Sequence, residues 1–594
     1  MKKIFLFLFM LFVPFVFYAK ELKREWVTIL GTDASESLNT SFVTSDGNHL
    51  AIYSSSKLDF VTFESYGGNI LVKYDKDVNI LWQEQWGGSL INNLDMTLTK
   101  NDELIAVGYF RADDINGLVN NGSDDIVIIK FDNNGKIVWQ KSIGGSKSER
   151  LYSTVALSDG TYVSSGYYGS TDIDGISNKG GKDAMIIRYD ETGNIIWQKS
   201  FGGSGDEAFE NIFLTKNEEI IACGYSSSTD IDGITNNGEK DALIVKYDKE
   251  GNILWKTTWA GAGKHISNKY LLTEDEEIIL FNEYYGEVDG LSFKGVNDVA
   301  IVKFDKNGNL IWQKSWGGSG EEYLYTYKVL NDGSIILVGD TDSSDIDNFS
   351  NKGKRDAFLL KYDKNGNLIW QKSWGGSNKD GFTDIDILNN NEIFVVGYTY
   401  SNDIDGLEFK GVQDGILLKY DMDGNVIWHD SFGEDGDEIF SYINVVDNGY
   451  VIGGMTNSIN IEGFENKGEF DGIFMKYYYK YLLNVVNTLN GSATALQVDN
   501  LGIITPKPNE GYEVDKIIVR DLNGDVLDVE VTKLEDGTYS FPLSDDVDIE
   551  VLFREKIENP KTGVFDYISF ILVGLLISFV GYNVINYNNQ KFEL

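Results

Sequence analysis

Paired aspartates recur along the chain in the phrase Thr-Asp-Ile-Asp-Gly and its variants. Carboxylate oxygens are the ligands that Ca²⁺ prefers, so each pair is a candidate calcium site, and calcium is the one cofactor that the sequence suggests. Asp and Gly are also favoured in turns for backbone reasons, which leaves a purely structural interpretation open beside the metal. The candidate ligands are Asp172, Asp174, Asp230, Asp232, Asp345, Asp347, Asp403 and Asp405.

Acidic residues also follow the recurring Gly-Gly-Ser phrase, as at Asp206 and Glu207 and at Glu321 and Glu322. Antiparallel strands alternate in direction, which places these acids on the same face of the fold as the aspartate pairs. One face is therefore expected to be strongly acidic. Because two converging carboxylates can also cleave a glycan, a polysaccharide-processing enzyme is an alternative to a binding protein.

A third acid occurs in seven copies of the same phrase, three residues after a glycine in each. Repeated use at one position indicates a shared structural role rather than a single active site, and we expect each side chain to cap a loop amide. These residues are Asp125, Asp183, Asp241, Asp298, Asp356, Asp414 and Asp471.

Few other residues could support chemistry. His49, His265 and His429 stand at different positions of the repeated phrase, so no recurring imidazole can act as a base or a metal ligand. The single cysteine, Cys223, excludes an intrachain disulfide. With 92 acidic and 51 basic residues the formal net charge is -41, which disfavours nucleic acid as a partner. We therefore expect a non-catalytic protein.

Eight tryptophans mark the repeated unit that must position these acids. Neighbouring members of this set are separated by 56 to 58 residues. Such regularity indicates one supersecondary unit used eight times. We expect the strand that carries each tryptophan to pack on the adjacent unit. The eight docking residues are Trp26, Trp82, Trp139, Trp197, Trp255, Trp312, Trp370 and Trp428.

Each unit contains four short strand-like runs, at 309–316, 323–330, 334–341 and 356–363 in one copy. They are rich in β-branched and aromatic residues and are bounded by Gly, Asn and Asp. The fourth run joins the next tryptophan run through Asp-Lys-Asn-Gly-Asn, in which Gly366 suits the left-handed position of a short hairpin with a bulge.

The two ends of the repeat region indicate whether the units form an open array or a closed ring. A tryptophan run at 25–30 precedes the first complete unit, and the last unit stops without one. Pairing the two would complete the eighth unit and remove two exposed sheet edges. The sequence thus predicts an all-β fold, a monomeric eight-bladed β-propeller of four-stranded blades over residues 24–480, in which the N-terminal strand closes the last blade.

Segment 201–255 carries Gly-Gly-Ser, a paired acid, Gly-Tyr, a Ser/Thr-Asp turn, Asp-Ala and Tyr-Asp-x-x-Gly in that order. This order resembles the SBBP repeat of bacterial β-propellers, and the resemblance covers about residues 26–480. It implies a propeller. That family is described as seven-bladed, whereas this chain supplies eight units.

After the repeats, residues 482–553 show alternating strands with Asn-Gly and Asp-Gly turns. The Gly-Tyr-x-Val-Asp and Gly-Thr-Tyr-x-Phe-Pro segments resemble divergent internalin-type B repeats of bacterial surface proteins. The resemblance implies a small β module that serves as a spacer.

The ends of the chain carry targeting signals. Residues 1–19 read as a secretory signal peptide, with an uncleaved anchor as the alternative. Residues 558–594 resemble a Gram-positive cell-wall sorting signal, with an apolar segment at 564–587 long enough to cross a bilayer. The matching motif residues are Asn559, Pro560, Lys561, Thr562 and Gly563.

By this resemblance a sortase would cut after Thr562 and join the chain to cell-wall peptidoglycan. The tail offers only Lys591 as a basic residue, so a retained single-pass membrane anchor is the alternative. These features predict an extracellular, surface-anchored adhesion protein whose propeller loops bind a glycan or a protein. An architectural surface spacer is a further alternative.

Overall fold

The computed structural model describes residues 21–556 except for short gaps, the longest of them at 56–67. Every regular element in that part of the chain is a β-strand. No helix found there has both the length and the apolar character needed to cross a bilayer. The predicted signal peptide, the sorting motif and the apolar segment 564–587 lie outside the described residues.

The chain divides into two compact units, residues 1–479 and residues 480–594. The first unit contains, among its described residues, eight four-stranded antiparallel sheets, which we number 1 to 8 along the chain. The predicted fold class, an all-β repeat of four-stranded propeller blades, is confirmed.

Sheets 1 to 4 are formed by consecutive strands. They comprise β2 (Glu36–Val43), β3 (His49–Ser55), β4 (Gly68–Tyr74) and β5 (Ile80–Trp86); β6 (Ile91–Leu98), β7 (Leu104–Phe110), β10 (Asp125–Phe131) and β11 (Ile137–Ile143); β12 (Glu149–Ala156), β13 (Tyr162–Tyr168), β14 (Asp183–Tyr189) and β15 (Ile195–Phe201); and β16 (Glu207–Leu214), β17 (Ile220–Ser226), β18 (Asp241–Tyr247) and β19 (Ile253–Trp259). The short strands β8 (Asp114–Ile115) and β9 (Leu118–Val119) form a hairpin beside sheet 2.

Sheets 5 to 7 repeat this order. They comprise β20 (His265–Leu272), β21 (Ile278–Tyr284), β22 (Asp298–Phe304) and β23 (Leu310–Trp316); β24 (Glu322–Val329), β25 (Ile335–Thr341), β26 (Asp356–Tyr362) and β27 (Leu368–Trp374); and β28 (Asp380–Leu388), β29 (Glu392–Thr399), β30 (Asp414–Tyr420) and β31 (Val426–Phe432).

Sheet 8 joins the two ends of the repeat region. Its strand order is β1-β36-β33-β32, where β1 (Glu21–Leu30) is the first strand of the chain and β36 (Asp471–Lys480) is the last strand of the repeats. Its other members are β32 (Glu438–Val446) and β33 (Gly449–Thr456), with the hairpin strands β34 (Asn460–Ile461) and β35 (Phe464–Glu465) in the intervening loop. The predicted pairing of the first and last strands is therefore confirmed.

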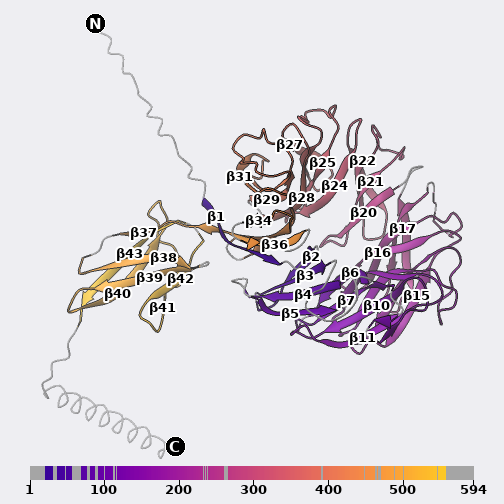
Figure 1. Ribbon diagram of the computed structural model, residues 1–594, viewed down its shortest axis with the longest axis horizontal. Coiled ribbons are helices and arrows are strands. Elements are labelled where there is room, and N and C mark those ends of the chain that lie inside the picture. Colours follow the sequence, from indigo (N-terminus) through magenta and orange to yellow (C-terminus); the bar gives the residue numbers. More distant parts are fainter. Residues whose placement is uncertain are drawn as a thin grey trace, which may run out of the picture. The chain divides into compact units, whose positions relative to one another are not determined.

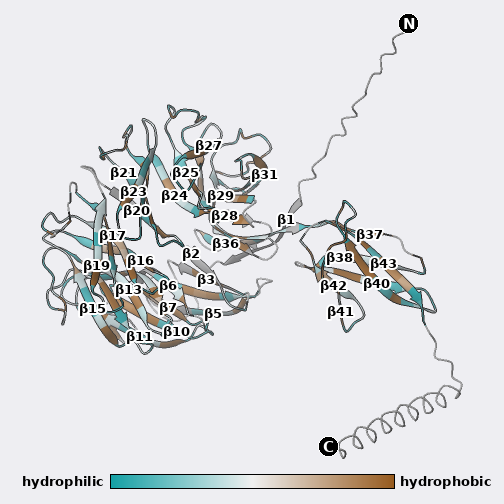
Figure 2. Ribbon diagram, turned by 180° about the vertical axis from the view of Figure 1, so that it is seen from behind, coloured by the Kyte–Doolittle hydropathy of each residue, from teal (hydrophilic) through white to brown (hydrophobic). Residues whose placement is uncertain are grey.

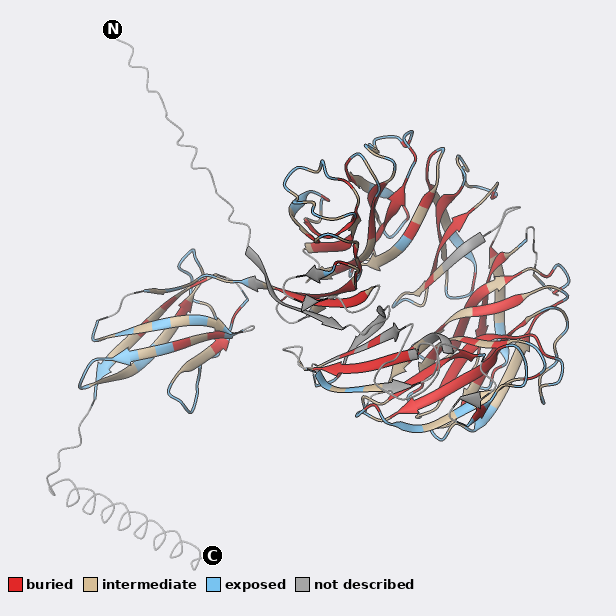
Figure 3. Ribbon diagram, viewed as in Figure 1, coloured by how far each residue is buried: buried red, intermediate tan, exposed pale blue. Residues whose placement is uncertain are grey.

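The sheets stand side by side around a centre. In Figure 1 the first strand of each sheet, such as β6, β16 or β24, lies towards this centre, and the tryptophan strands β11, β15 and β27 lie on the outside. The two middle strands of each sheet are almost wholly buried, as Figure 3 shows in red. Figure 2 shows apolar residues along these same strands.

Neighbouring sheets are held together by apolar side chains from their middle strands. Sheets 3 and 4, for example, share a cluster that includes Ile186, Phe209 and Leu243. Sheet 8 meets sheet 1 through Tyr74 and Phe474, whose rings stack with centroids 5.5 Å apart. Aromatic pairs of this kind contribute beyond the area that they bury.

The repeated tryptophans lie between adjacent sheets. The indole N–H of Trp255 donates to the carbonyl of Lys306 at 3.1 Å, in the turn before the next tryptophan strand. That turn places Gly308, with φ of +81°, against the ring of Trp255. Trp82, Trp139, Trp197, Trp312 and Trp370 lie likewise against Gly135, Gly193, Gly251, Gly366 and Gly424. Trp428 packs edge-on against Tyr477, and the side chain of Trp26 is outside the described residues.

The second unit is a small β module built from two sheets. One has the order β37-β43-β40 and the other the order β38-β39-β42-β41. The strands are β37 (Leu483–Val486), β38 (Gly491–Val498), β39 (Leu501–Pro508), β40 (Tyr512–Arg520), β41 (Thr532–Lys533), β42 (Tyr539–Pro542) and β43 (Val547–Glu555). Its core includes Ile504, Phe541 and Ile549.

Candidate functional site

The first aspartate of each predicted calcium pair binds a neighbouring backbone amide. Asp172 Oδ1 accepts the amide of Ser146 at 3.0 Å, and this hydrogen bond lowers the pKa of the Asp172 carboxyl. Asp230, Asp345 and Asp403 accept the amides of Ser204, Ser319 and Ser377 in the same way. These carboxylates tie the long loop of each sheet to its Gly-Gly-Ser crossing, as the structural interpretation of the phrase requires.

In two of the pairs the second aspartate takes part through its backbone. Gln198 Nε2 donates to the carbonyl oxygen of Asp174 at 2.6 Å, and Gln371 makes the same bond to Asp347. The side chains of these aspartates are exposed. Asp232 lies outside the described residues. Among the residues that are described, no group of three or more His, Cys, Asp or Glu side chains is arranged to hold a metal ion.

Calcium binding by these loops stays a prediction, and heat denaturation can test it. A ligand that binds only the folded protein raises the melting temperature as its concentration rises. If the aspartate pairs bind Ca²⁺, millimolar calcium should raise the melting temperature of the intact chain, and a chelator should reverse the rise. A melting temperature that does not respond to either addition would contradict calcium binding.

The second acid of the crossing between sheets is buried where it opens the first strand of sheets 4 and 6 and opens β32 of sheet 8. Glu207, Glu322 and Glu438 are 0% exposed. Glu322 accepts hydrogen bonds from the amide of Gly318 at 3.2 Å and from the hydroxyl of Thr341 at 2.7 Å. This acid therefore does not contribute to the expected acidic face, because consecutive strand residues point to opposite faces. A carboxylate so enclosed cannot meet a polysaccharide.

The recurring acid that opens the third strand caps a loop amide in sheets 2, 3, 5, 6 and 7, as predicted. Asp125 Oδ2 accepts the amide of Asn121 at 2.9 Å, and Asp356 Oδ2 accepts the amide of Lys352 at 2.8 Å. Asp183, Asp298 and Asp414 accept the amides of Lys179, Lys294 and Lys410. Each carboxylate holds the end of the long loop against the sheet.

Two of these buried acids meet where one sheet crosses to the next. Asp298 and Glu322 both lie against Gly317, where an added Cβ would come within 2.5 Å of Asp298 Oδ1 and 2.4 Å of Glu322 Oε2. Burial raises the pKa of Asp298 to about 6 and that of Glu322 to about 7. The same pairing recurs at Asp356 and Asp380, where both pKa values are again raised by burial. We call these pairs the junction carboxylates.

A cavity of about 390 Å³ lies on sheets 6 and 7. Tyr323 and Tyr325 come from β24, the strand nearest the centre of the ring, and Tyr398 comes from β29. Its charged lining residues are Asp340, Asp342, Lys354, Arg355 and Lys379. We call it the tyrosine cavity.

Arg355 organises the charges of the tyrosine cavity. Its guanidinium donates to Asp340 at 2.7 Å and to Glu321 at 2.9 Å, and it lies 4.7 Å from the ring centroid of Tyr323. The Tyr398 hydroxyl donates to Asp340 Oδ2 at 3.2 Å. The network fixes the tyrosine rings in place before any ligand arrives.

Two cations of the tyrosine cavity remain available to a ligand. Burial raises the pKa of the Tyr325 and Tyr398 hydroxyls above the ordinary tyrosine value, so both stay protonated, and Tyr398 donates its proton to Asp340. Lys354 and Lys379 are exposed, and neither forms an ion pair with another described residue. The cavity therefore combines aromatic surfaces with fixed donors and acceptors and two unpaired cations.

Sequence reasoning missed the tyrosine cavity, although the sequence contains a signal for it. Asp340 stands where other units have tyrosine after the glycine, as at Tyr225 and Tyr398. Arg355 stands where two other units have Lys182 and Lys240. Both departures fall in the same unit, and the structure shows that the two residues form an ion pair.

Comparison with known proteins supports the repeat character of the chain. No family model matches it. An uncharacterized WD repeat-containing protein of Acanthamoeba polyphaga mimivirus is 20% identical over 537 residues, covering 68% of this chain and 38% of that protein. The regulatory protein FlaEY of Caulobacter vibrioides is 23% identical over 252 residues, covering 38% of this chain and 26% of that protein. The chain thus spans well under half the length of these curated relatives.

Solved structures with a similar arrangement include a WD40 domain. The Pan2 WD40 domain of Neurospora crassa is 10% identical, with a TM-score of 0.34, and the match covers 61% of this chain and 86% of that one. Sqt1 of Chaetomium thermophilum is 9% identical, with a TM-score of 0.39, and the match covers 77% of this chain and all of that one (100%). The sheet topology itself makes this chain a β-propeller repeat protein.

Proposed function

We propose that this protein is a non-catalytic binding protein of the cell surface and that its propeller recognises a glycan. The tyrosine cavity carries the proposal. A sugar ring has an apolar C–H face, which packs on aromatic rings, and hydroxyl groups, which need fixed donors and acceptors. Tyr323, Tyr325 and Tyr398 supply the rings, while the Arg355 network and the two lysines supply the polar partners.

A scaffold role without catalysis is consistent with the site. The carboxylates of the tyrosine cavity are engaged by Arg355 and by tyrosine hydroxyls, and the junction carboxylates are enclosed. One relative is named as a WD repeat-containing protein, and the repeat character that it shares with this chain is consistent with the same reading.

The proposed location is extracellular. The apolar N-terminal segment, the sorting-type motif at 559–563 and the SBBP-type and internalin-type resemblances support secretion followed by attachment. In this proposal a sortase joins Thr562 to peptidoglycan, or the segment 564–587 holds the chain in the membrane, and the second unit acts as a spacer.

A glycan array tests the proposal. The intact chain should bind at least one class of extracellular polysaccharide, and Tyr398→Leu should weaken that binding about tenfold, the loss expected when one aromatic contact of about 1.4 kcal/mol is removed. Tyr225→Leu is the matched control, because Tyr225 occupies the same repeat position in sheet 4. It should bind as the unaltered chain does.

Three outcomes would contradict the proposal. The chain could bind no glycan on the array, the two leucine variants could lose binding equally, or shortened products could appear from a bound polysaccharide. Binding to extracellular matrix proteins alone would assign the propeller to a protein partner instead.

A further inference from the structure

A glutamine bridges neighbouring outer strands at two of the described sheet boundaries, between sheets 4 and 5 and between sheets 5 and 6. The indole N–H of Trp259 donates to Gln313 Oε1 at 2.7 Å, and Trp316 donates to Gln371 Oε1 at 2.7 Å. Gln313 Nε2 also donates to the carbonyl of Asp289, in the long loop, at 2.5 Å. One amide side chain thus bridges the tryptophan of one sheet and the loop of the next.

Sheet 7 departs from this arrangement at a single residue. His429 stands at the position of Gln313 and Gln371, three residues after the start of its strand. Its imidazole lies against the loop, since an added Cβ on Gly406 would come within 2.7 Å of His429 Nε2. Within the described part of the chain the indole N–H of Trp374 makes no hydrogen bond, so the tryptophan end of the bridge is lost.

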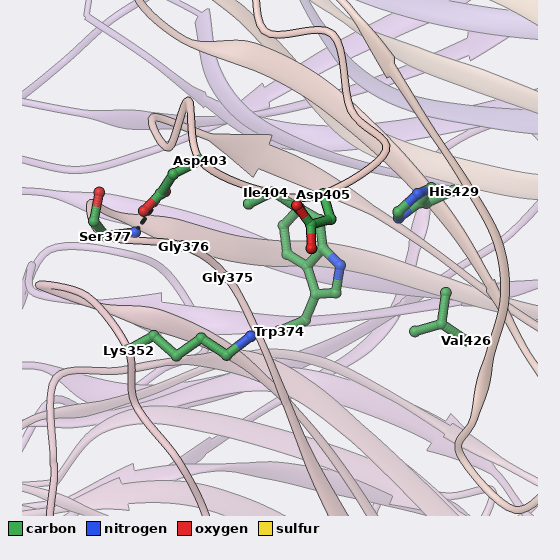
Figure 4. A pocket seen from close by; sticks show the side chains of 10 residues that line it. All are labelled: Lys352, Trp374, Gly375, Gly376, Ser377, Asp403, Ile404, Asp405, Val426 and His429. Atoms are coloured by element: carbon green, nitrogen blue, oxygen red, sulfur yellow. Dashed lines mark hydrogen bonds between the residues drawn. The ribbon is translucent and has the colours of Figure 1, made fainter.

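A cavity of about 340 Å³ lies where the bridge is missing. Figure 4 shows the side chains of Lys352, Asp405 and His429 arranged around the indole of Trp374, with Val426 at the side. Asp403 is turned to Ser377 and bonds its amide. We call this cavity the histidine pocket.

The polar groups of the histidine pocket include both donors and acceptors of hydrogen bonds. Trp374 and Lys352 can only donate hydrogen bonds, ionised Asp405 can only accept them, and a neutral imidazole can do both. A hydroxyl group can donate and accept hydrogen bonds at the same time, so the hydroxyl groups of a ligand can pair with all four of these side chains. Val426 and Ile404 offer apolar contacts to the carbon atoms of a ligand. A volume above 300 Å³ is within the range of small-ligand sites.

We propose that the histidine pocket is a second ligand site of the propeller and that it takes a single sugar residue. It is built from sheets 6 and 7 at the outer strands, whereas the tyrosine cavity uses the inner ones. The proposal extends glycan recognition to a second place on the same protein but does not depend on the tyrosine cavity.

The substitution His429→Gln tests the proposal, because it should restore the bridge seen at Gln371. Saturation-transfer NMR on the intact chain, with the methyl glycosides of glucose, galactose, mannose and N-acetylglucosamine as probes, should show contact with at least one of them. His429→Gln should reduce that affinity at least tenfold without lowering the melting temperature, which separates loss of the site from loss of the fold. Asp405→Asn should also weaken binding.

Two controls make the outcome decisive. Lys294→Gln alters the residue of sheet 5 equivalent to Lys352 and should leave binding unchanged. Tyr398→Leu should leave the pocket's binding unchanged as well, so failure of the tyrosine cavity and failure of the histidine pocket are distinguishable. Absence of contact with every glycoside, full binding by His429→Gln, or a preference for acetate over the sugars would overturn the proposal.

Discussion

Raising the pH from about 5 to about 8 is expected to destabilise the propeller, with a fall in its melting temperature that is steepest between about pH 5 and pH 6 and ends near pH 7. The cause is the burial of the junction carboxylates. Glu322 has its pKa raised from 4.5 to about 7, and Asp298 has its pKa raised to about 6. The folded protein therefore holds protons that the unfolded chain releases.

The sign and the size of this effect follow from linkage. A carboxyl whose pKa is raised on folding stabilises the folded state at low pH, and that contribution is lost as the pH rises through the folded pKa. For Glu322 alone the loss is on the order of 3 kcal/mol. Burial also raises the pKa of Asp356, Asp380 and Asp414, so further junctions add in the same direction.

Carboxyls whose pKa is lowered in the folded protein do not affect the melting temperature between about pH 5 and pH 8. Glu218, paired with Lys249, has its pKa lowered to about 2. The stability that it contributes is present above the ordinary carboxyl pKa and is lost only as the pH falls below about 4. Melting curves recorded between about pH 5 and pH 8 therefore report on the junction carboxylates.

A matched pair of variants identifies the groups. Glu322→Gln replaces the ionisable carboxyl by an amide of the same shape, so the melting temperature at pH 8 should rise and the slope with pH should become shallower. Glu250→Gln, on an exposed turn, should change neither. An unaltered slope in Glu322→Gln would show that the pH response arises elsewhere.

The substitution Gly308→Ala should lower the free energy of unfolding by about 2 to 5 kcal/mol. Gly308 has φ of +81°, a conformation that costs an L-residue about 1 to 2 kcal/mol. The added Cβ would also lie 2.8 Å from the ring of Trp255, and overpacking of this kind costs typically about 1 to 3 kcal/mol. The displaced indole would lose its 3.1 Å hydrogen bond to Lys306 as well.

The control separates backbone strain from tryptophan docking. Gly160 has φ of +84° and no heavy atom within 4 Å of an added Cβ. Gly160→Ala should therefore cost only the backbone term. Denaturation of both variants measures the difference, and equal losses would mean that the docked tryptophan contributes nothing at this contact.

The fold could be predicted from the sequence because the residues that determine it act locally and recur from unit to unit. Each turn, such as the one at Gly366, is specified within five residues, and the tryptophans repeat at a nearly constant interval. The pairing of β1 with β36 followed from the missing strand at one end. The repeat also correctly indicated that Asp125 and its equivalents cap loop amides.

The sites were harder to predict because they arise where units differ. Glu321 and Glu322 are adjacent in sequence, yet Glu321 pairs with Arg355 of the tyrosine cavity, whereas Glu322, the first residue of the strand, is enclosed. The tyrosine cavity needs residues from three strands and two loops, whose meeting depends on packing between sheets. The histidine pocket depends on one residue, His429. Its role becomes visible only when the structure shows the hydrogen bond that Gln371 makes at the equivalent position of sheet 6.

The most direct test of glycan recognition is the structure of the protein with its array-selected glycan bound. The proposal predicts a sugar ring packed on Tyr323 or Tyr398, with hydroxyls bonded to the Arg355 network or to Lys354 and Lys379. A glycan held elsewhere on the propeller, with these tyrosines still facing solvent, would contradict it.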